Sequence, residues 1–187
     1  MLAYRQSAEV RIVKGVPVFA LVVSFFTDLG LNYLMGQAKE PARVFRPALE
    51  QIQPQTRIAI LLPSKLPSLI RERDIKLAWG TVSEDGYFIS LYFTELGSNA
   101  TFAAGFGGSV GVLRDLPNTR PIALAGGLIG RFRPVSCGGS CAPANLWWEQ
   151  NGVMYQIQIK LRSTLKEKDQ ERILVETANS TVTVRRE

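Results

Sequence analysis

The chain has 187 residues, of which 46% are hydrophobic and 20% charged, a composition typical of a globular domain and unlike that of a disordered chain. Its 22 lysines and arginines exceed its 16 aspartates and glutamates, which gives a formal net charge of +6. It contains no histidine. Without histidine there is no Ser-His-Asp triad, Cys-His dyad, HExxH zinc site or imidazole acid–base catalysis.

The first 38 residues have the parts of a secretory signal. Three basic residues within 5–14 precede an uncharged apolar run over 16–26. The best cleavage point follows Ala38. We therefore expect residues 1–38 to be a signal peptide and the remaining chain to be periplasmic or extracellular.

Two alternatives remain for this segment. The stretch from Val16 to Met35 has the length of a transmembrane helix, so it could instead be an uncleaved membrane anchor. Asp28 would then lie in the hydrocarbon layer, where an aspartate costs about 2.5–3.5 kcal/mol at the centre of a span. The segment could also be a buried N-terminal helix of a cytosolic protein, although such an apolar run is unusual for a surface helix.

Residues 39–56 are predicted to form a short helical lead-in to the domain. Pro47 suits the first turn of a helix, and Pro54 would end it. Apolar residues alternate in the segment that follows, which predicts a strand over 57–62.

A first β-hairpin is predicted around the turn Glu84-Asp85-Gly86, because apolar residues alternate on both sides of it. A three-residue turn with Gly86 in the left-handed conformation would pair Trp79 with Leu91. This register would bring the large apolar side chains of both strands to one face.

The next segment, 99–130, is rich in glycine and other small residues. Gly105, Gly107, Gly108 and Gly111 loosely resemble a nucleotide-binding GxGxxG loop. However, no GK[ST] follows them, and Asp115-Leu116-Pro117 would cut short any following helix. We predict instead a flat or bulged strand region where backbones approach closely, followed by a strand over 128–135.

A second hairpin is predicted at Asn151-Gly152, the dipeptide preferred in type I′ turns. The two-residue turn would pair Trp148 with Tyr155 and direct both toward the core. Trp147 and Glu149 would then lie on the opposite face. Trp147 is the one aromatic residue that we expect to be exposed there, so Trp147 and Glu149 are the candidate binding residues.

Thr164-Leu165-Lys166-Glu167 has the pattern of a capping box that opens a helix, which would end at about Asn179. The apolar residues of this helix can form one stripe against a sheet. Val182 and Val184 would follow as a short terminal strand. We therefore predict that 57–187 is a single α+β domain, a curved antiparallel sheet of about six to eight strands packed by the C-terminal helix.

Cys137 and Cys141 have C-x3-C spacing, not the C-x-x-C spacing of redox motifs. In an exported protein the expected state is a structural disulfide, which would stabilise such a small loop by about 2 kcal/mol. The alternative is a catalytic or sensing dithiol, although no thioredoxin-like βαβ pattern surrounds the pair. Two cysteines without histidine do not make a four-ligand zinc site, and we predict no metal or cofactor.

The remaining charged residues show no arrangement for catalysis or nucleic-acid binding. No two carboxylates are placed at the separation that a glycosidase needs. Lysines and arginines mostly alternate with acidic residues and are not interleaved with aromatics as in nucleic-acid platforms. We therefore predict no catalytic residues and no nucleic-acid partner.

The run SCGGSCAPANLWWEQNGVMYQIQIKL, followed by a polar helix ending in ETANST, resembles a family of uncharacterised cyanobacterial exported proteins. It is also similar, more remotely, to the domain at the C-termini of bacterial anti-sigma and sporulation-associated proteins. In that domain a W-x-x-x-G-x-x-Y hairpin precedes a helix ending in A-x-S. The matching residues here are Trp148, Gly152, Tyr155, Ala178 and Ser180. The resemblance, which extends over 57–184, implies fold and export and transfers no catalytic residue.

These observations together predict a non-catalytic exported or envelope protein that binds or senses an envelope protein or a lipid through its sheet face or loops. One alternative is a thiol/disulfide-active protein that uses Cys137 and Cys141. Another is a membrane-anchored structural component, held by the segment from Val16 to Met35.

Overall fold

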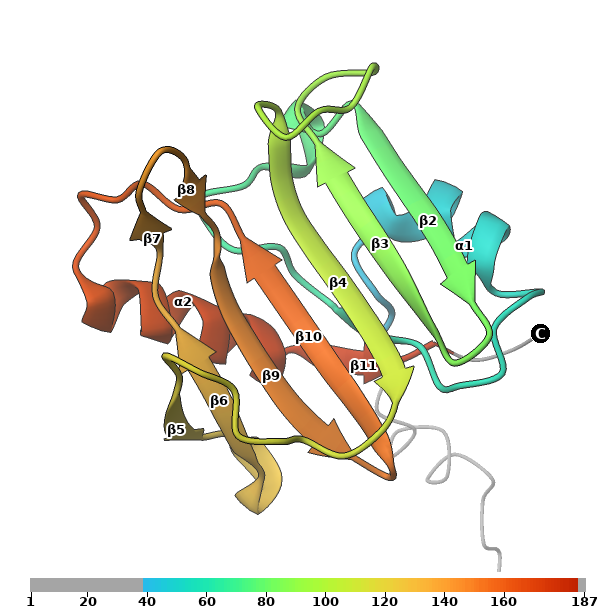
Figure 1. The fold of residues 1–187 in the computed structure, drawn as a ribbon. Coiled ribbons are helices and arrows are strands. Elements are labelled where there is room, and N and C mark those ends of the chain that lie inside the picture. The colour runs from blue at the N-terminus through green and yellow to red at the C-terminus, as the bar shows by residue number, and fades with distance from the viewer. Residues whose placement is uncertain (1–38, 185–187) are drawn as a thin grey trace, which may run out of the picture. The chain divides into compact units, whose positions relative to one another are not determined.

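Seven antiparallel strands form one sheet in the computed structural model, which describes residues 39–184 (Figure 1). Their order across the sheet is β2 (Leu77–Ser83), β3 (Gly86–Tyr92), β4 (Phe102–Val110), β10 (Val153–Ile159), β9 (Ala144–Gln150), β6 (Ile129–Arg133) and β5 (Arg120–Ala123). The sheet does not close on itself, because β2 and β5 form its two edges. The predicted signal peptide or anchor lies outside the described residues.

The other elements are shorter or lie against this sheet. The helices are η1 (Arg43–Phe45), α1 (Arg46–Ile52), η2 (Glu72–Asp74), η3 (Ala125–Gly127) and α2 (Glu167–Asn179). Two further antiparallel pairs are β1 (Leu61–Pro63) with β11 (Thr181–Thr183), and β7 (Ser136–Cys137) with β8 (Cys141–Ala142). Figure 1 shows α1 and α2 behind the sheet, on the same side of it. The predicted α+β class, with an antiparallel sheet packed by the C-terminal helix, is confirmed.

The core lies between the sheet and these helices. Side chains alternate between the two faces of a strand, and the inward set is almost entirely apolar. Its members on the sheet include Ile89, Leu91, Phe106, Phe132, Leu146, Trp148, Ile157 and Ile159, all buried. Helix α2 adds Ile173, Leu174 and Ala178, which is the stripe expected from the sequence. Phe45, just before α1, packs edge-to-face on Phe106 with ring centroids 5.0 Å apart.

Helix α2 ends at Asn179 as predicted, but the predicted capping box is not formed. The helix begins at Glu167, and no side-chain hydrogen bond caps its N-terminus. The buried amide of Gln170 fixes this end instead. It donates to the carbonyl of Leu165 at 2.7 Å and accepts from the backbone N–H of Val135 at 2.8 Å. Gln170 thereby joins the start of the helix to the segment that follows β6.

The hairpin of β2 and β3 differs from the prediction. Ser83 pairs with Gly86 and Trp79 pairs with Ser90, so the turn has two residues, Glu84 and Asp85. Gly86 is not in the left-handed conformation. Glycine is needed here because the backbone of β4 is so close that a Cβ atom would be 2.5 Å from the carbonyl oxygen of Gly108.

The reason for this register lies in helix α1. The helix packs against β2 at Gly80, where a Cβ atom would be 2.4 Å from Cγ2 of Ile52. Ala78 and Gly80 therefore face the core, since only small residues fit beneath the helix. The large side chain of Trp79 points to the other face. The expectation that the large apolar side chains of both strands share one face was wrong.

The hairpin of β9 and β10 agrees with the prediction. Gln150 pairs with Val153 and Trp148 pairs with Tyr155. Asn151 and Gly152 have φ values of 55° and 73°, as a type I′ turn requires.

The strand predicted over 57–62 is shorter and lies later in the chain, as β1. Just before β1, where the strand was expected, the Tyr155 hydroxyl donates to the Ala59 carbonyl at 3.1 Å. The Tyr87 hydroxyl accepts from the N–H of Leu61 at 2.9 Å and donates to the carbonyl of Leu61 at 3.2 Å. Two tyrosines of the sheet thus hold β1 against the core face.

Replacement of Tyr87 by phenylalanine should destabilise the fold by about 2–4 kcal/mol, because both buried backbone groups of Leu61 lose a partner. Urea denaturation of the two proteins measures this difference. Thr81→Val, which removes an exposed hydroxyl bonded to the carbonyl of Phe88, is the control and should cost much less. Equal stabilities for wild type and Tyr87→Phe would contradict the anchoring role.

Stability should also fall at alkaline pH. Burial raises the pKa of Tyr87 and of Tyr155 above the ordinary value of 10.0. The folded state then keeps protons that the unfolded state releases. This contribution should be complete below about pH 10 and decline as the pH rises above it. The denaturation midpoint should drop as the pH rises above about 10, and it should drop less steeply in Tyr87→Phe. Parallel curves for the two proteins would rule out a contribution from Tyr87.

Candidate functional site

The face of the sheet turned away from α1 and α2 is towards the viewer in Figure 1. We call the outward-facing side chains of its four strands β2, β3, β4 and β10 the open face. They are Leu77, Trp79, Thr81 and Ser83; Phe88, Ser90 and Tyr92; Phe102, Gly105, Gly107 and Ser109; and Met154, Gln156 and Gln158. None of these residues is a lysine, arginine, aspartate or glutamate.

Strand register aligns this face in two rows that run across the strands. One row is Trp79, Ser90, Gly105 and Gln158, and the other is Thr81, Phe88, Gly107 and Gln156. Each row therefore has an aromatic side chain on β2 or β3, a glycine on β4 and a glutamine on β10.

The glycines of β4 form a floor on which Phe88 lies. A Cβ atom at Gly105 would be 2.4 Å from Cζ of Phe88, and one at Gly107 would be 2.6 Å from Cδ2 of the same ring. Phe102 also reaches this floor, with its Cζ 3.2 Å from the Cβ position of Gly105. The glycine-rich segment is thus a strand with close approaches, as predicted, and not a nucleotide-binding loop.

A β-bulge places Phe102 on the open face. Leu91 pairs with Ala104 but Tyr92 pairs with Phe102, so Ala103 is an extra residue in β4. The bulge turns Phe102 to the side of Tyr92, and the two rings meet at a centroid distance of 6.0 Å and an angle of 74°. Phe88, Phe102 and Tyr92 therefore form a continuous aromatic surface.

Trp79 stands beside this surface on the edge strand β2. Its partner across the ladder is Ser90, whose small side chain lies between those of Phe88 and Tyr92 on β3. Trp79 is 51% exposed, in contrast to the buried Trp148 of the core. A half-exposed indole on a rigid strand is a ready contact for a ligand.

Amide and hydroxyl groups border the aromatic surface. Gln156 donates to the side-chain oxygen of Asn145 on β9 at 2.9 Å. Within the described chain, the side chains of Gln158 and Ser90 make no hydrogen bond to protein, and both are only half-buried. These two side chains are free to bond a ligand.

The candidate binding residues named from the sequence lie beside the open face, on β9. Trp147 and Glu149 point away from the core as predicted. However, Trp147 is only 7% exposed, and the guanidinium carbon of Arg133 lies 4.9 Å from the centroid of its ring. Glu149 accepts the backbone N–H of Leu113 at 3.1 Å. The expectation that Trp147 is exposed was wrong, and its role in binding stays a prediction.

The exposed tryptophan is Trp79, which the predicted three-residue turn would have placed on the same face as Leu91. The signal that could have found it is the pair of small residues Ala78 and Gly80 on either side. Such residues mark a close approach by another element, but periodicity alone does not identify that element.

The two cysteines form the predicted disulfide. It joins the two-residue strands β7 and β8, with Cα atoms 4.0 Å apart, in an exposed hairpin. In the described residues, no cluster of three or more cysteine, aspartate or glutamate side chains could hold a metal ion.

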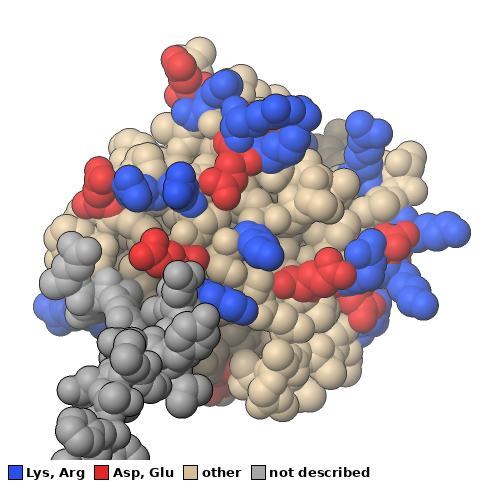
Figure 2. Space-filling view, turned by 180° about the vertical axis from the view of Figure 1, so that it is seen from behind, with Lys and Arg blue, Asp and Glu red and all other residues tan. Residues whose placement is uncertain are grey.

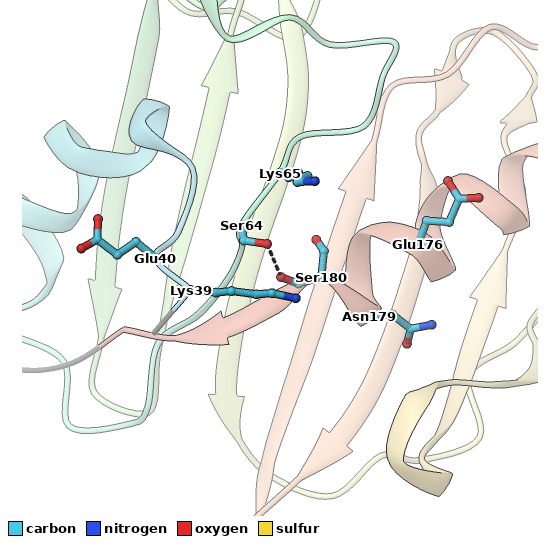
Figure 3. A pocket seen from close by; sticks show the side chains of 7 residues that line it. All are labelled: Lys39, Glu40, Ser64, Lys65, Glu176, Asn179 and Ser180. Carbon is cyan, nitrogen blue, oxygen red and sulfur yellow. Dashed lines mark hydrogen bonds between the residues drawn. The ribbon is translucent and has the colours of Figure 1, made fainter. Parts of the chain in front are cut away.

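A groove of about 580 Å³ lies at the C-terminal end of α2 (Figure 3). Its lining residues are Lys39, Glu40, Ser64, Lys65, Glu176, Asn179 and Ser180. The N–H and hydroxyl of Ser64 both donate to the carbonyl of Ser180 at 3.0 Å, which attaches the end of the helix to the residue after β1. The charged side chains spread along the groove in Figure 3 and do not converge on one point. We therefore interpret these residues as structural contacts and not as a ligand-binding site.

The helix side of the molecule contrasts with the open face. Figure 2 shows basic and acidic side chains interspersed over that side. Ion pairs there include Arg120 with Glu167 and Glu171, and Arg172 with Glu176. The open face, which carries no charged side chain, thus differs from the helix side of the molecule.

No family model, no curated protein and no solved structure matches the chain. The resemblances to exported cyanobacterial proteins and to anti-sigma domains therefore stay predictions. Over residues 39–184, the structure has no helix long and apolar enough to cross a membrane. The predicted anchor, from Val16 to Met35, is not among those residues.

The disulfide should contribute modestly to stability. Because it closes a very small loop, replacement of both Cys137 and Cys141 by serine should cost about 2 kcal/mol or less and leave the circular dichroism spectrum unchanged. Thermal denaturation of the variant and of reduced wild-type protein measures the cost. Unfolding of the variant at 25 °C would show that the hairpin is essential to the fold.

Proposed function

We propose that this protein is an exported or envelope protein whose domain is a non-catalytic binding or sensing module, with the open face as its binding surface. The observation that carries the proposal is the half-exposed Trp79 beside the aromatic surface of Phe88, Phe102 and Tyr92. Large aromatic side chains in preformed positions dominate binding energies at protein surfaces.

The rigidity of the surface supports the same proposal. Its side chains stand on four paired strands, and the ring of Phe88 is confined by the glycine floor. Binding to a preformed surface costs little conformational entropy, which leaves more of the contact energy as affinity. The module would therefore bind without a large rearrangement.

Export is supported by two independent features. The segment 1–38 has the parts of a secretory signal, and the Cys137–Cys141 disulfide is of a kind that persists in oxidising compartments. A periplasmic or extracellular location follows if the signal is cleaved. An uncleaved segment from Val16 to Met35 would hold the module at the membrane, as a structural component or a tethered binding domain.

The second candidate is thiol/disulfide activity. The exposed position of the Cys137–Cys141 bond, at the tip of a short hairpin, is the observation that favours it. An insulin reduction assay on the full chain tests this candidate. Turnover that disappears when both cysteines are replaced would support it over a binding role.

Trp79→Ala should weaken binding while the protein stays folded. Three envelope fractions of the native host serve as probes, namely soluble proteins, vesicles of extracted lipids and released saccharides. At least one should change the tryptophan fluorescence of the full chain, and the variant should lose affinity by at least about tenfold. Loss of the exposed side chain should change stability by less than about 1 kcal/mol.

The matched control is Leu69→Ala. Leu69 is 59% exposed, similar to Trp79, but it is not part of the open face. Its replacement should leave binding unchanged. If none of the three fractions is bound, or if both variants weaken binding equally, the open face is not the binding surface.

A further inference from the structure

We propose that the ligand of the open face is a neutral oligosaccharide that lies across β2, β3, β4 and β10. This inference rests on the proposed function and names its ligand class. Three properties of the face point to it, namely its lack of charge, its aromatic surface and its free amide and hydroxyl groups.

Charge is the first property. The chain has 22 basic and 16 acidic residues, yet none of them is among the outward-facing side chains of these four strands. Nucleic acids, anionic lipid headgroups and acidic peptides are bound through lysine and arginine. The face offers such ligands no counter-charge, so its electrostatics match a neutral ligand.

The arginines of β6, which is separated from the open face by β9, are already engaged. Arg133 stacks on the ring of Trp147, and Arg131 forms an ion pair with Asp115. They do not extend a positive surface onto the open face.

The aromatic surface is the second property. Phe88 lies flat over Gly105 and Gly107, and Phe102 meets both this floor and Tyr92. Trp79 adds a half-exposed indole at the edge. The C–H groups on one side of a sugar ring carry partial positive charge, and they pack favourably against the negative face of an aromatic ring.

The free polar groups are the third property, and they separate a sugar from an acyl chain or an apolar peptide. Gln158 and Ser90 lie in the same row as Trp79. An amide and a hydroxyl each offer donors and acceptors, which is what the hydroxyl groups of a sugar require. A wholly apolar ligand would bury these groups without partners, which is unfavourable.

The dimensions favour an oligosaccharide over a single sugar. Neighbouring strands are about 4.8 Å apart, so the backbones of β2 and β10 are separated by roughly 14 Å. A row that begins at Trp79 and ends at Gln158 therefore extends beyond one sugar ring. The ligand would run across the strands, with its apolar faces on the aromatic side and its hydroxyl groups at β10.

The test uses the full chain and hexasaccharides of defined linkage, with β-1,4-linked glucose, β-1,4-linked N-acetylglucosamine and α-1,4-linked glucose as probes. Binding is followed by tryptophan fluorescence and by calorimetry. At least one probe should bind, and its affinity should be nearly independent of salt between about 0.05 and 0.5 M, because no ion pair is involved. Acrylamide quenching of the exposed Trp79 should decrease on binding.

Two variants localise the site. Trp79→Ala should lose affinity by about tenfold or more, and Gln158→Ala should lose severalfold, while Leu69→Ala should bind as wild type does. Circular dichroism verifies that each variant is folded. If Trp79→Ala does not fold, Trp79→Phe is measured in its place. Because phenylalanine retains an aromatic ring, this variant should lose less affinity than Gln158→Ala.

Two comparison probes separate the failure of this inference from that of the proposed function. They are vesicles of phosphatidylglycerol and the soluble envelope proteins of the host. Binding of either one through Trp79, with no saccharide bound, would overturn the oligosaccharide and keep the open face as a binding surface. If neither these probes nor the saccharides change the signal of Trp79, both proposals fail.

Discussion

The contact of helix α1 with β2 decides what the open face presents. At Gly80 the helix approaches so closely that a Cβ atom would be 2.4 Å from Ile52, and the Gln51 side chain accepts the Gly80 N–H at 3.1 Å. One helix therefore covers β2 on its inner side and satisfies a donor of this edge strand. Since side chains alternate along a strand, the same contact turns Trp79 outward. The candidate site depends on a packing constraint on the opposite side of the sheet.

The glycines of β4 make room for aromatic rings on both faces of the sheet. Gly105 and Gly107 make room for Phe88 on the open face, while a Cβ atom at Gly108 would be 2.9 Å from the ring of Tyr87 on the core face. Glycine in a strand weakens it, but here aromatic rings from neighbouring strands cover the exposed backbone. One sequence feature thus serves both the anchoring of β1 by Tyr87 and the flat surface proposed for ligand binding.

Local patterns in the sequence were sufficient wherever the physical cause was itself local. Asn151-Gly152 favours positive φ at both positions, so the turn and the register of β9 and β10 were predicted correctly. The apolar stripe of α2, its end at Asn179 and the Cys137–Cys141 pairing belong to the same group. Each depends on residues only a few positions apart in the chain.

The sequence by itself determined the α+β class, the second hairpin and the apolar stripe that α2 buries. The tertiary structure alone decided the register of the first hairpin and the exposure of the two outward tryptophans. Trp79 is exposed because α1 requires small residues beside it, and Trp147 is covered because Arg133 stacks on it. These contacts join segments far apart in the chain or on different strands, and hydrophobic periodicity carries no information about which segments will meet.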